Sequence, residues 1–229
     1  MPSEIAVVIP AYNEEASIAR VVSDIPAGLV AEVVVVDNNS TDATAEKARN
    51  TGATVIHAPH QGYGYACQKG IDYLGAGERK PDIVVFMDGD YSDYPEEITS
   101  LVKPVIEQGF DLVIGSRLLG MKSKRTMPLH QFIGNRLLTR LIRVLYGVWF
   151  TDLGPFRAIR YDKLIGLDIR DRTYGWTTEM QVKAVKQGLR ITEVPVSYRE
   201  RIGKSKISGT VKGTISALYR ILVVIFRNL

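Results

Sequence analysis

Short apolar runs alternate with amphipathic stretches through the first half of the chain, and this alternation limits the possible folds more than any other feature. The runs are of strand length and rich in valine and isoleucine, at residues 5–9, 32–36, 54–57, 83–87 and 112–114. Strands separated by helix-length segments are typical of βαβ units, in which helices cover both faces of a parallel sheet. The sequence therefore predicts an α/β fold with a Rossmann-like, mostly parallel sheet flanked by helices.

Helix signals are clearest in residues 95–109. Pro95 stands in the first turn with two glutamates behind it, apolar residues recur at helical spacing, and Gly109 marks the stop. Proline at the start, acids in the first turn and glycine after the last turn are the usual boundary signals. Pro104 lies inside this segment and is expected to bend the helix.

The second half of the chain is less regular. Its pattern predicts helices near 129–146 and 177–187, strands near 156–159 and 190–198, and a final helix from about residue 209. No linker or internal repeat interrupts the pattern. Residues 1–229 are therefore expected to form a single domain.

Charge is divided unevenly along the chain. Residues 1–114 carry 7 Lys+Arg and 18 Asp+Glu, whereas residues 115–229 carry 22 and 7. A strongly positive half is expected to meet an anionic partner, such as a diphosphate, a lipid phosphate or an acidic membrane face. Attraction between the two halves would explain part of the same split without any ligand.

Cysteine usage and the chain ends indicate a cytoplasmic protein. A lone cysteine, Cys67, excludes an internal disulfide framework and a Cys-based metal cluster. The start of the chain lacks the basic flank and apolar stretch of a secretory signal. The apolar run 215–226 is interrupted by Arg220 and is shorter than the ~20 residues of a spanning helix, so the chain is not expected to cross a membrane.

Polar motifs follow three of the predicted strands: PAYNE at 10–14, DNNSTD at 37–42 and DGD at 88–90. The carboxyl ends of parallel strands meet at one sheet edge, where open α/β sheets bind their ligands. Asp88 and Asp90 can point to one side, while Gly89 lets a ligand approach the backbone. Two carboxylates, completed by diphosphate and water oxygens, suit Mg²⁺ or Mn²⁺. A surface turn is the alternative for an isolated Asp-x-Asp.

Two further segments suit anionic oxygen. Gly62, in the stretch 61–65, precedes a helical pattern whose first backbone amides can bind phosphate; a plain loop is the alternative. Residues 199–206 carry four cations around Gly203, and such a loop can close over a diphosphate and exclude water; a solvated loop is the alternative. Arg117, after the fifth strand, is expected to reach the same sheet edge.

These motifs together resemble a known family. The pieces IAVVIPAYNEE, VVVVDNNSTD, IVVFMDGD and LVIGSR resemble, in order and spacing, the family 2 glycosyltransferases of the GT-A fold. In the second half, TDLGPFRAI, RTYGWTTEMQVKA and EVPVSYRERIGKSKISGT are similar to the branch that contains dolichyl- and polyprenyl-phosphate sugar transferases. The resemblance covers nearly the whole chain.

The resemblance implies roles for individual residues. Asp88 and Asp90 correspond to the ligands of Mg²⁺ or Mn²⁺, and Arg117 lies near the donor diphosphate or the acceptor phosphate. Asn38 and Ser92 depart from the family pattern, since many relatives carry an acid at the first position and some carry glutamine at the second. The residues expected to bind the nucleotide sugar are Pro10, Ala11, Tyr12, Glu14, Asp37, Gly62, Asp88, Gly89, Arg201 and Lys206.

The implied reaction is a metal-dependent, inverting transfer of a hexose from a UDP- or GDP-sugar to a polyprenyl or dolichyl phosphate. Inversion needs an in-line nucleophile, neutralisation of the leaving diphosphate and, for a hydroxyl acceptor, a base. Asp90 and Arg117 are predicted to serve the transfer, and Glu179 to act as base or acceptor contact with Asp152 behind it. A helix-start carboxylate is the alternative for Glu179. A phosphate acceptor is already ionised and needs no strong base.

Residues 1–115 are expected to bind the nucleotide sugar and residues 116–229 the acceptor. The helix near 129–146 and the C-terminal helix are amphipathic and can lie in a bilayer interface, although core or dimer packing is the commoner use of an apolar stripe. The expected location is the cytoplasm, including peripheral contact with the cytoplasmic face of a membrane.

Two other functions remain open at this stage. One is a soluble glycosyltransferase that acts on a phosphorylated small molecule or a saccharide hydroxyl. The other is a noncatalytic nucleotide or nucleic-acid binding module that uses the basic half. The acidic strand ends disfavour the module, as does the lack of a basic sheet studded with aromatic residues, so nucleic acid is not an expected partner. The sugar, the base of the donor and the oligomeric state are left open.

Overall fold

The structure is a computed structural model of the chain and describes residues 3–120, 128–203 and 211–229. Within these residues, seven strands form one sheet in the order β3-β2-β1-β4-β6-β5-β7. The strands are β1 (Ile5–Ala11), β2 (Glu32–Asp37), β3 (Thr54–His57), β4 (Ile83–Phe86), β5 (Leu112–Ser116), β6 (Arg157–Arg160) and β7 (Ile191–Pro195). The helices are α1 (Ile18–Ser23), α2 (Thr44–Arg49), α3 (Tyr63–Ala76), α4 (Ile98–Gln108), α5 (Leu129–Tyr146), α6 (Tyr161–Gly166), α7 (Trp176–Lys186) and α8 (Val211–Arg227).

The sheet is mostly parallel, as predicted. β1 pairs in parallel with β2 on one side and with β4 on the other, and β2 pairs in parallel with β3. β6 is the exception, because it runs antiparallel between β4 and β5. The carboxyl ends of β1, β2 and β4 therefore meet at one edge, where all three polar motifs emerge.

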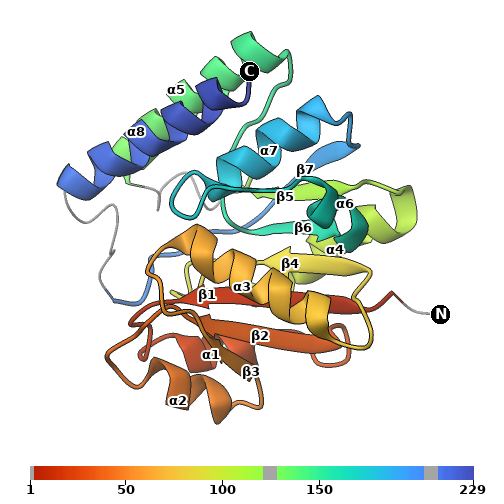
Figure 1. Cartoon of the computed structure of the whole chain (residues 1–229), viewed down its shortest axis with the longest axis vertical. Helices are drawn as coiled ribbons and strands as arrows, with labels where there is room; N and C mark the ends of the chain where they lie inside the picture. The colour runs from red at the N-terminus through yellow and green to blue at the C-terminus, as the bar shows by residue number, and fades with distance from the viewer. Residues whose placement is uncertain (1–2, 121–127, 204–210) are drawn as a thin grey trace.

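Alternate residues of the strands supply two separate apolar cores. In β1, Ala6 and Val8 pack into the core on one face, whereas Val7 and Ile9 pack into the core on the other. The first core is covered by α3, α5 and α7, and the second by α1 and α4 (Figure 1). Strands buried on both faces read as continuous apolar runs, which explains the valine-rich segments of the sequence.

Several boundaries differ from the sequence-based expectation. The predicted helix 95–109 begins with a 3₁₀ turn at Pro95–Glu97 before α4, and Gly109 ends it with a left-handed φ of 68°. β7 is shorter than the predicted strand 190–198, and the short helix α6 was not predicted. Element ends depend on tertiary contacts that a local pattern does not contain.

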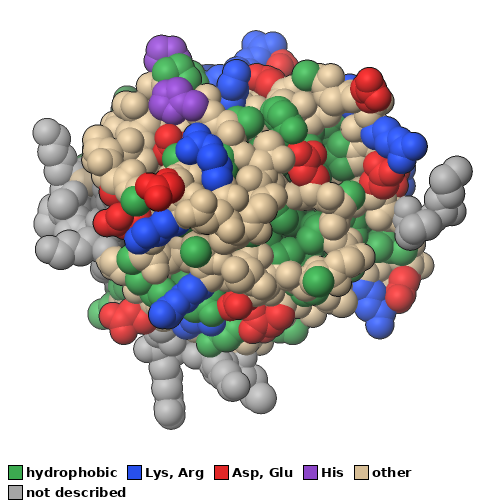
Figure 2. Space-filling model, turned by 90° about the horizontal axis from the view of Figure 1, so that it is seen from below, with side chains coloured by type: hydrophobic (Ala, Val, Ile, Leu, Met, Phe, Trp, Pro, Cys, Tyr) green, Lys and Arg blue, Asp and Glu red, His purple; other side chains and the backbone are tan. Residues whose placement is uncertain are grey.

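Helices α5 and α8 lie side by side at one end of the molecule (Figure 1). The hydroxyl of Tyr146 in α5 donates a 2.6 Å hydrogen bond to the backbone oxygen of Ile225 in α8. At the opposite end, around α2 and β3, basic and acidic side chains are interspersed (Figure 2). Among the described residues, no helix has the length and apolar character needed to cross a membrane.

We expect Gly70→Ala to destabilise the fold, because a Cβ at Gly70 would lie 2.5 Å from Cγ1 of the buried Val8. Overpacking of a core costs about 1–3 kcal/mol, and the gain in helix propensity offsets at most about 1 kcal/mol of this. Chemical denaturation should therefore show a free energy of unfolding lowered by about 1–2 kcal/mol.

Gly134→Ala in α5 is the matched control, since a Cβ there meets nothing within 4 Å. This variant should be as stable as the wild type or more stable. A Gly70→Ala protein that unfolds at the wild-type denaturant concentration would contradict the packing of α3 on β1.

Candidate functional site

A cavity of about 280 Å³ opens where β1, β2 and β4 end. We call it the strand-edge cavity. It collects nine of the predicted site residues, and Asn38, Gln61, Tyr63 and Tyr174 complete its lining. The nine are Pro10, Ala11, Tyr12, Glu14, Gly62, Asp88, Gly89, Asp90 and Arg201.

Backbone strain is concentrated at the same edge. Asn13, Asn39 and Tyr91 have positive φ angles of 52°, 67° and 65°, and each follows one of the three strands that end there. Left-handed backbone is uncommon outside glycine and collects at binding and active sites. The strain therefore marks the same edge as the polar motifs do.

Carboxylates crowd the end of β4. Desolvation raises the pKa of Asp88 well above its usual value, and the charges of Asp90 and Asp93 raise it further. Burial, followed by the charge of Asp90, raises the pKa of Asp93 to about 7. One oxygen of Asp93, Oδ1, is buried without a hydrogen-bond partner. Burial and mutual repulsion therefore disfavour the charged forms of Asp88 and Asp93.

Arg201 forms ion pairs with carboxylates at this edge. Its Nη2 lies 2.7 Å from Oδ2 of Asp90 and 3.4 Å from Oε1 of Glu14. The backbone N–H of Ile202 donates a 3.0 Å bond to the backbone oxygen of Asp90, and that of Arg199 donates to Ser92. The segment that carries Arg201 is thereby held against the end of β4.

Asn38 also lines the strand-edge cavity. Its amide donates to the backbone oxygens of Ala58 and His60, and its Oδ1 accepts a 2.7 Å bond from the N–H of Gly62. Gly62 has a φ of 148°, and a Cβ there would lie 2.4 Å from the backbone oxygen of Arg172. An acid in place of Asn38 could not donate these bonds, so the departure from the family pattern has a structural use here.

A second cavity, of about 310 Å³, continues from the first toward α5 and α8. We call it the helix-side cavity. The two cavities share Tyr63, Asp88, Asp90, Tyr174 and Arg201 in their linings. The helix-side cavity adds polar side chains such as Arg117, Asn135 and Tyr198, and an apolar wall of Leu138, Leu153, Pro155, Ala217, Leu218 and Ile221.

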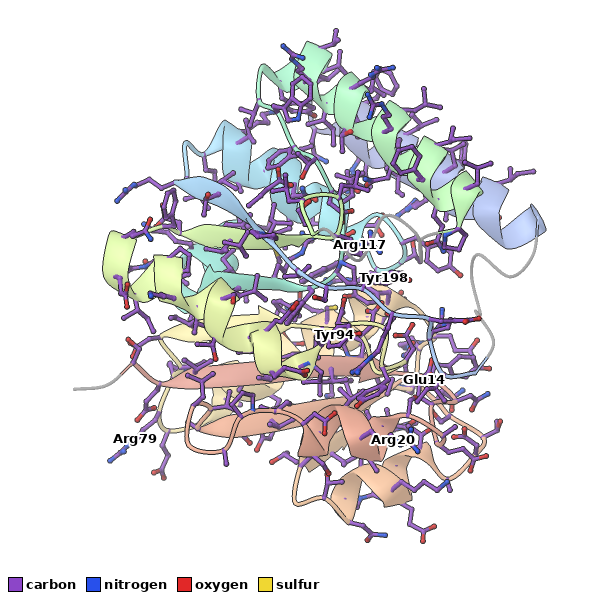
Figure 3. All side chains as sticks on the ribbon, turned by 180° about the vertical axis from the view of Figure 1, so that it is seen from behind. Glu14, Arg20, Arg79, Tyr94, Arg117 and Tyr198 are labelled. Carbon is purple, nitrogen blue, oxygen red and sulfur yellow. The ribbon has the colours of Figure 1, made fainter. Side chains whose placement is uncertain are left out.

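Arg117 is held in place by Asp152. Its Nε and Nη2 donate 2.8 Å bonds to the two oxygens of this fully buried carboxylate, and its backbone N–H donates a third bond. Burial alone would lower the pKa of Arg117, but the charge and hydrogen bonds of Asp152 raise it, so the guanidinium stays charged. Its carbon lies 5.2 Å from the ring centroid of Tyr198, and the two side chains lie close together in Figure 3. Asp152 thus positions Arg117 and does not itself line either cavity.

Two other predicted residues lie outside both cavities. Asp37 accepts a bond from the N–H of Ser40 and contacts Nδ1 of His57 at 3.3 Å. The carboxylate of Glu179, 1% exposed, accepts the N–H groups of Arg170 and Asp171 and pairs with Lys183 and Arg227. These contacts engage both oxygens of Glu179, and the geometry argues against the predicted role as a base. Lys206 lies outside the described residues.

Several lining residues had no specific signal in the sequence. Tyr174 and Tyr198 belong to motifs that we used for the family resemblance, and Tyr63 lies in the stretch 61–65, but no local pattern showed that their side chains face the cavities. Asp93 follows DGD by three positions and was not singled out. Its proximity to Asp88 and Asp90 depends on the turn after β4, which a strand pattern does not predict.

The donor set fits a hard divalent ion only in part. In the described part of the chain no group of three or more His, Cys, Asp or Glu side chains forms a complete metal site. Asp88 and Asp90 offer carboxylate oxygens beside a buried, unpartnered oxygen of Asp93. Mg²⁺ is commonly held by one or two carboxylates plus substrate phosphates and waters, which matches a partial protein site of this kind.

Comparison with known proteins gives the family. A model described as glycosyl transferase family 2 matches residues 6–167. An uncharacterised glycosyltransferase of Mycobacterium tuberculosis is 37% identical over 217 residues, which cover 93% of this chain and 94% of the relative. A dolichyl-phosphate hexose transferase of Haloferax volcanii is 36% identical over 208 residues, covering 89% of this chain and 86% of the relative. The predicted resemblance to the lipid-phosphate branch is confirmed.

The fold agrees. The crystal structure of glucosyl-3-phosphoglycerate synthase from Mycobacterium tuberculosis, in complex with Mn²⁺, UDP and glucosyl-3-phosphoglycerate, superposes with a TM-score of 0.79 over 99% of this chain and 80% of that one, at 23% identity. The predicted GT-A architecture is therefore confirmed. The chain belongs to glycosyl transferase family 2 and is a glycosyltransferase with the GT-A fold.

Proposed function

We propose that the protein transfers a hexose, with inversion, from a UDP- or GDP-sugar to a polyprenyl or dolichyl phosphate. The observation that carries the proposal is the continuity of the two cavities, one polar and one with an apolar wall, which share Asp88 and Asp90 in their linings. A nucleotide sugar suits the first and a phosphate on a hydrocarbon chain suits the second. Their junction is where the reacting groups would meet.

The donor is assigned to the strand-edge cavity. Pro10, Ala11 and Tyr12 would border the nucleoside with Glu14, and Gly89 lets the diphosphate approach the backbone. Asp88 and Asp90 would hold Mg²⁺ or Mn²⁺, which when bound neutralises charge on the departing nucleotide diphosphate. Support for the ion comes from the donor set and from the Mn²⁺ and UDP of the solved structure with the same fold.

The acceptor phosphate is assigned to Arg117. A guanidinium kept charged by Asp152 at the wall of a cavity suits a phosphate, which it can bind through two parallel hydrogen bonds. An ionised phosphate oxygen attacks without a base, which agrees with the engagement of Glu179 in structural contacts. In this proposal Asp152 and Glu179 act by positioning other groups.

Donor binding is thereby assigned mainly to residues 1–115, with Tyr174 and Arg201 added from the second half, and acceptor binding mainly to residues 116–229. The apolar wall of the helix-side cavity comes largely from α5 and α8, and it supports a lipid acceptor over a phosphorylated small molecule or a saccharide. A lipid acceptor resides in a bilayer, so we place the working enzyme at the cytoplasmic face of a membrane. The relative that is a dolichyl-phosphate hexose transferase supports the same acceptor class.

Asp90→Asn is expected to lower metal-dependent nucleotide release by about a hundredfold or more, because it removes a charged ligand while keeping the side-chain shape. Titration with Mn²⁺ should show weakened binding in the same variant. Both measurements can be made on purified protein with the donor sugar.

The control is Asp72→Asn, which alters an exposed carboxylate on α3 that accepts a hydrogen bond from Gln68. It should leave release and Mn²⁺ affinity at wild-type values. Wild-type turnover in a folded Asp90→Asn protein would remove the basis of the donor assignment.

Leu218→Asn is expected to raise the KM for a long-chain polyprenyl phosphate about tenfold, because it replaces an apolar contact in the helix-side cavity by a polar one. The KM for a prenyl phosphate of minimal chain length should change little, since that acceptor lacks the contact. Initial rates against acceptor concentration give both values.

Ile106→Asn, at an exposed position of α4 away from both cavities, is the matched control. Equal effects of Leu218→Asn on long and short acceptors would contradict an acceptor chain lying on this wall.

A further inference from the structure

A groove of about 600 Å³ runs along α5 and shares no lining residue with the strand-edge or helix-side cavity. Its walls carry Arg136, Arg140 and Arg143 beside the aromatic rings of Phe132 and Trp149. We call it the arginine groove. The proposed transfer reaction gives it no role.

The arginines of the groove form one exposed stripe at spacings of four and three residues, on one side of the helix. The guanidinium of Arg143 lies 4.1 Å from the centroid of the Trp149 ring. No Asp or Glu occurs between Asp111 and Asp152 in the sequence. Among the described residues, none of the three arginines forms an ion pair. The groove therefore carries positive charge that the protein itself does not neutralise.

An exposed apolar stripe runs next to the arginines. Ile133, Leu137 and Val144 of α5 are 49%, 59% and 81% exposed. On α8, which lies beside α5 in Figure 1, Tyr219 and Phe226 are 68% and 54% exposed. A helix surface with arginines bordering an apolar stripe is typical of helices that lie in the interface of a bilayer.

We propose that the arginine groove binds the phosphate headgroups of anionic phospholipids and so docks α5 and α8 on a membrane surface. Guanidinium groups bind phosphate in bidentate fashion, and apolar side chains beside them can enter the acyl boundary. A second copy of the chain fits less well, because neither α5 nor α8 contains an acidic residue and two such faces would repel each other. Charge complementarity thus selects an anionic bilayer.

Docking in this way has a consequence for the acceptor. Leu138 of α5 and Leu218 and Ile221 of α8 belong to the apolar wall of the helix-side cavity. With both helices on the membrane, this wall would adjoin the layer in which a polyprenyl chain resides. That orientation rests on the proposed function, whereas headgroup binding by the arginine groove does not.

The test compares vesicle flotation of the wild type with that of a triple variant, Arg136→Gln, Arg140→Gln and Arg143→Gln. The wild type should bind vesicles that contain phosphatidylglycerol and leave vesicles of phosphatidylcholine alone largely unbound. The triple variant should bind the anionic vesicles about a hundredfold more weakly, since three basic residues that attract the anionic surface are removed.

A charge-matched control carries Arg20→Gln, Arg49→Gln and Lys69→Gln at exposed positions of α1, α2 and α3. It should bind as the wild type does. Equal binding of the wild type to neutral and anionic vesicles, binding to neither, or undiminished binding by the triple variant would overturn the proposal. A fall in molecular mass of the triple variant in sedimentation velocity would assign the groove to a second copy and would also overturn it.

Nucleotide release with a short, water-dispersed prenyl phosphate and no vesicles separates this proposal from the previous one. The triple variant should turn over this acceptor as the wild type does. Lost vesicle binding with retained turnover supports the headgroup site, whereas an inactive wild type would count against the transfer reaction and not against the groove.

Discussion

The parallel pairing of β1 with both β2 and β4 is the constraint on which the site depends. Ala11 stands opposite Asp37 in one register, and Val8 stands opposite Phe86 in the other. These registers make the three strands end at one edge, so that residues far apart in sequence line one cavity. A shift of one residue in either pairing would turn each buried valine of the strand to the other face. The two apolar cores thus fix the positions of the polar residues.

Carboxylates at the sheet edge are paired with arginines from the second half of the chain. The carboxylates after β4 repel one another, and Arg201 and Arg117 approach them from the second half of the chain. Arg117 carries its own buried partner in Asp152, whose backbone is in turn bound by Glu193. Removing one member of a buried ion pair costs about 3–5 kcal/mol, because the remaining charge is left buried without a partner. Asp152 and Arg117 therefore stabilise each other. The uneven division of charge seen in the sequence therefore reflects in part an attraction between the halves, since Arg201 pairs with Asp90 and Glu14.

The sequence predicts the parts of this structure that depend on local pattern. The strands β1 to β5, the polar ends of three of them and the long helices α5 and α8 follow from apolar periodicity and from glycine and proline signals. The direction of β6 does not, because the sequence of a four-residue strand is compatible with either direction. Glu179 shows the same limit: its place in the first turn of α7 was visible, but its partners Arg227 and Asp171 come from other segments. Asn38 appeared as a departure from a family pattern, and only its bonds to the 58–62 loop explain it.

Donor and acceptor specificity are tested most directly by nucleotide release from a panel of UDP- and GDP-sugars, with Mn²⁺ or EDTA, and with a polyprenyl phosphate, 3-phosphoglycerate or no acceptor. The account predicts release that requires the metal and rises only when the lipid phosphate is present. Release that is insensitive to EDTA, or that rises with 3-phosphoglycerate and not with the lipid, would contradict it.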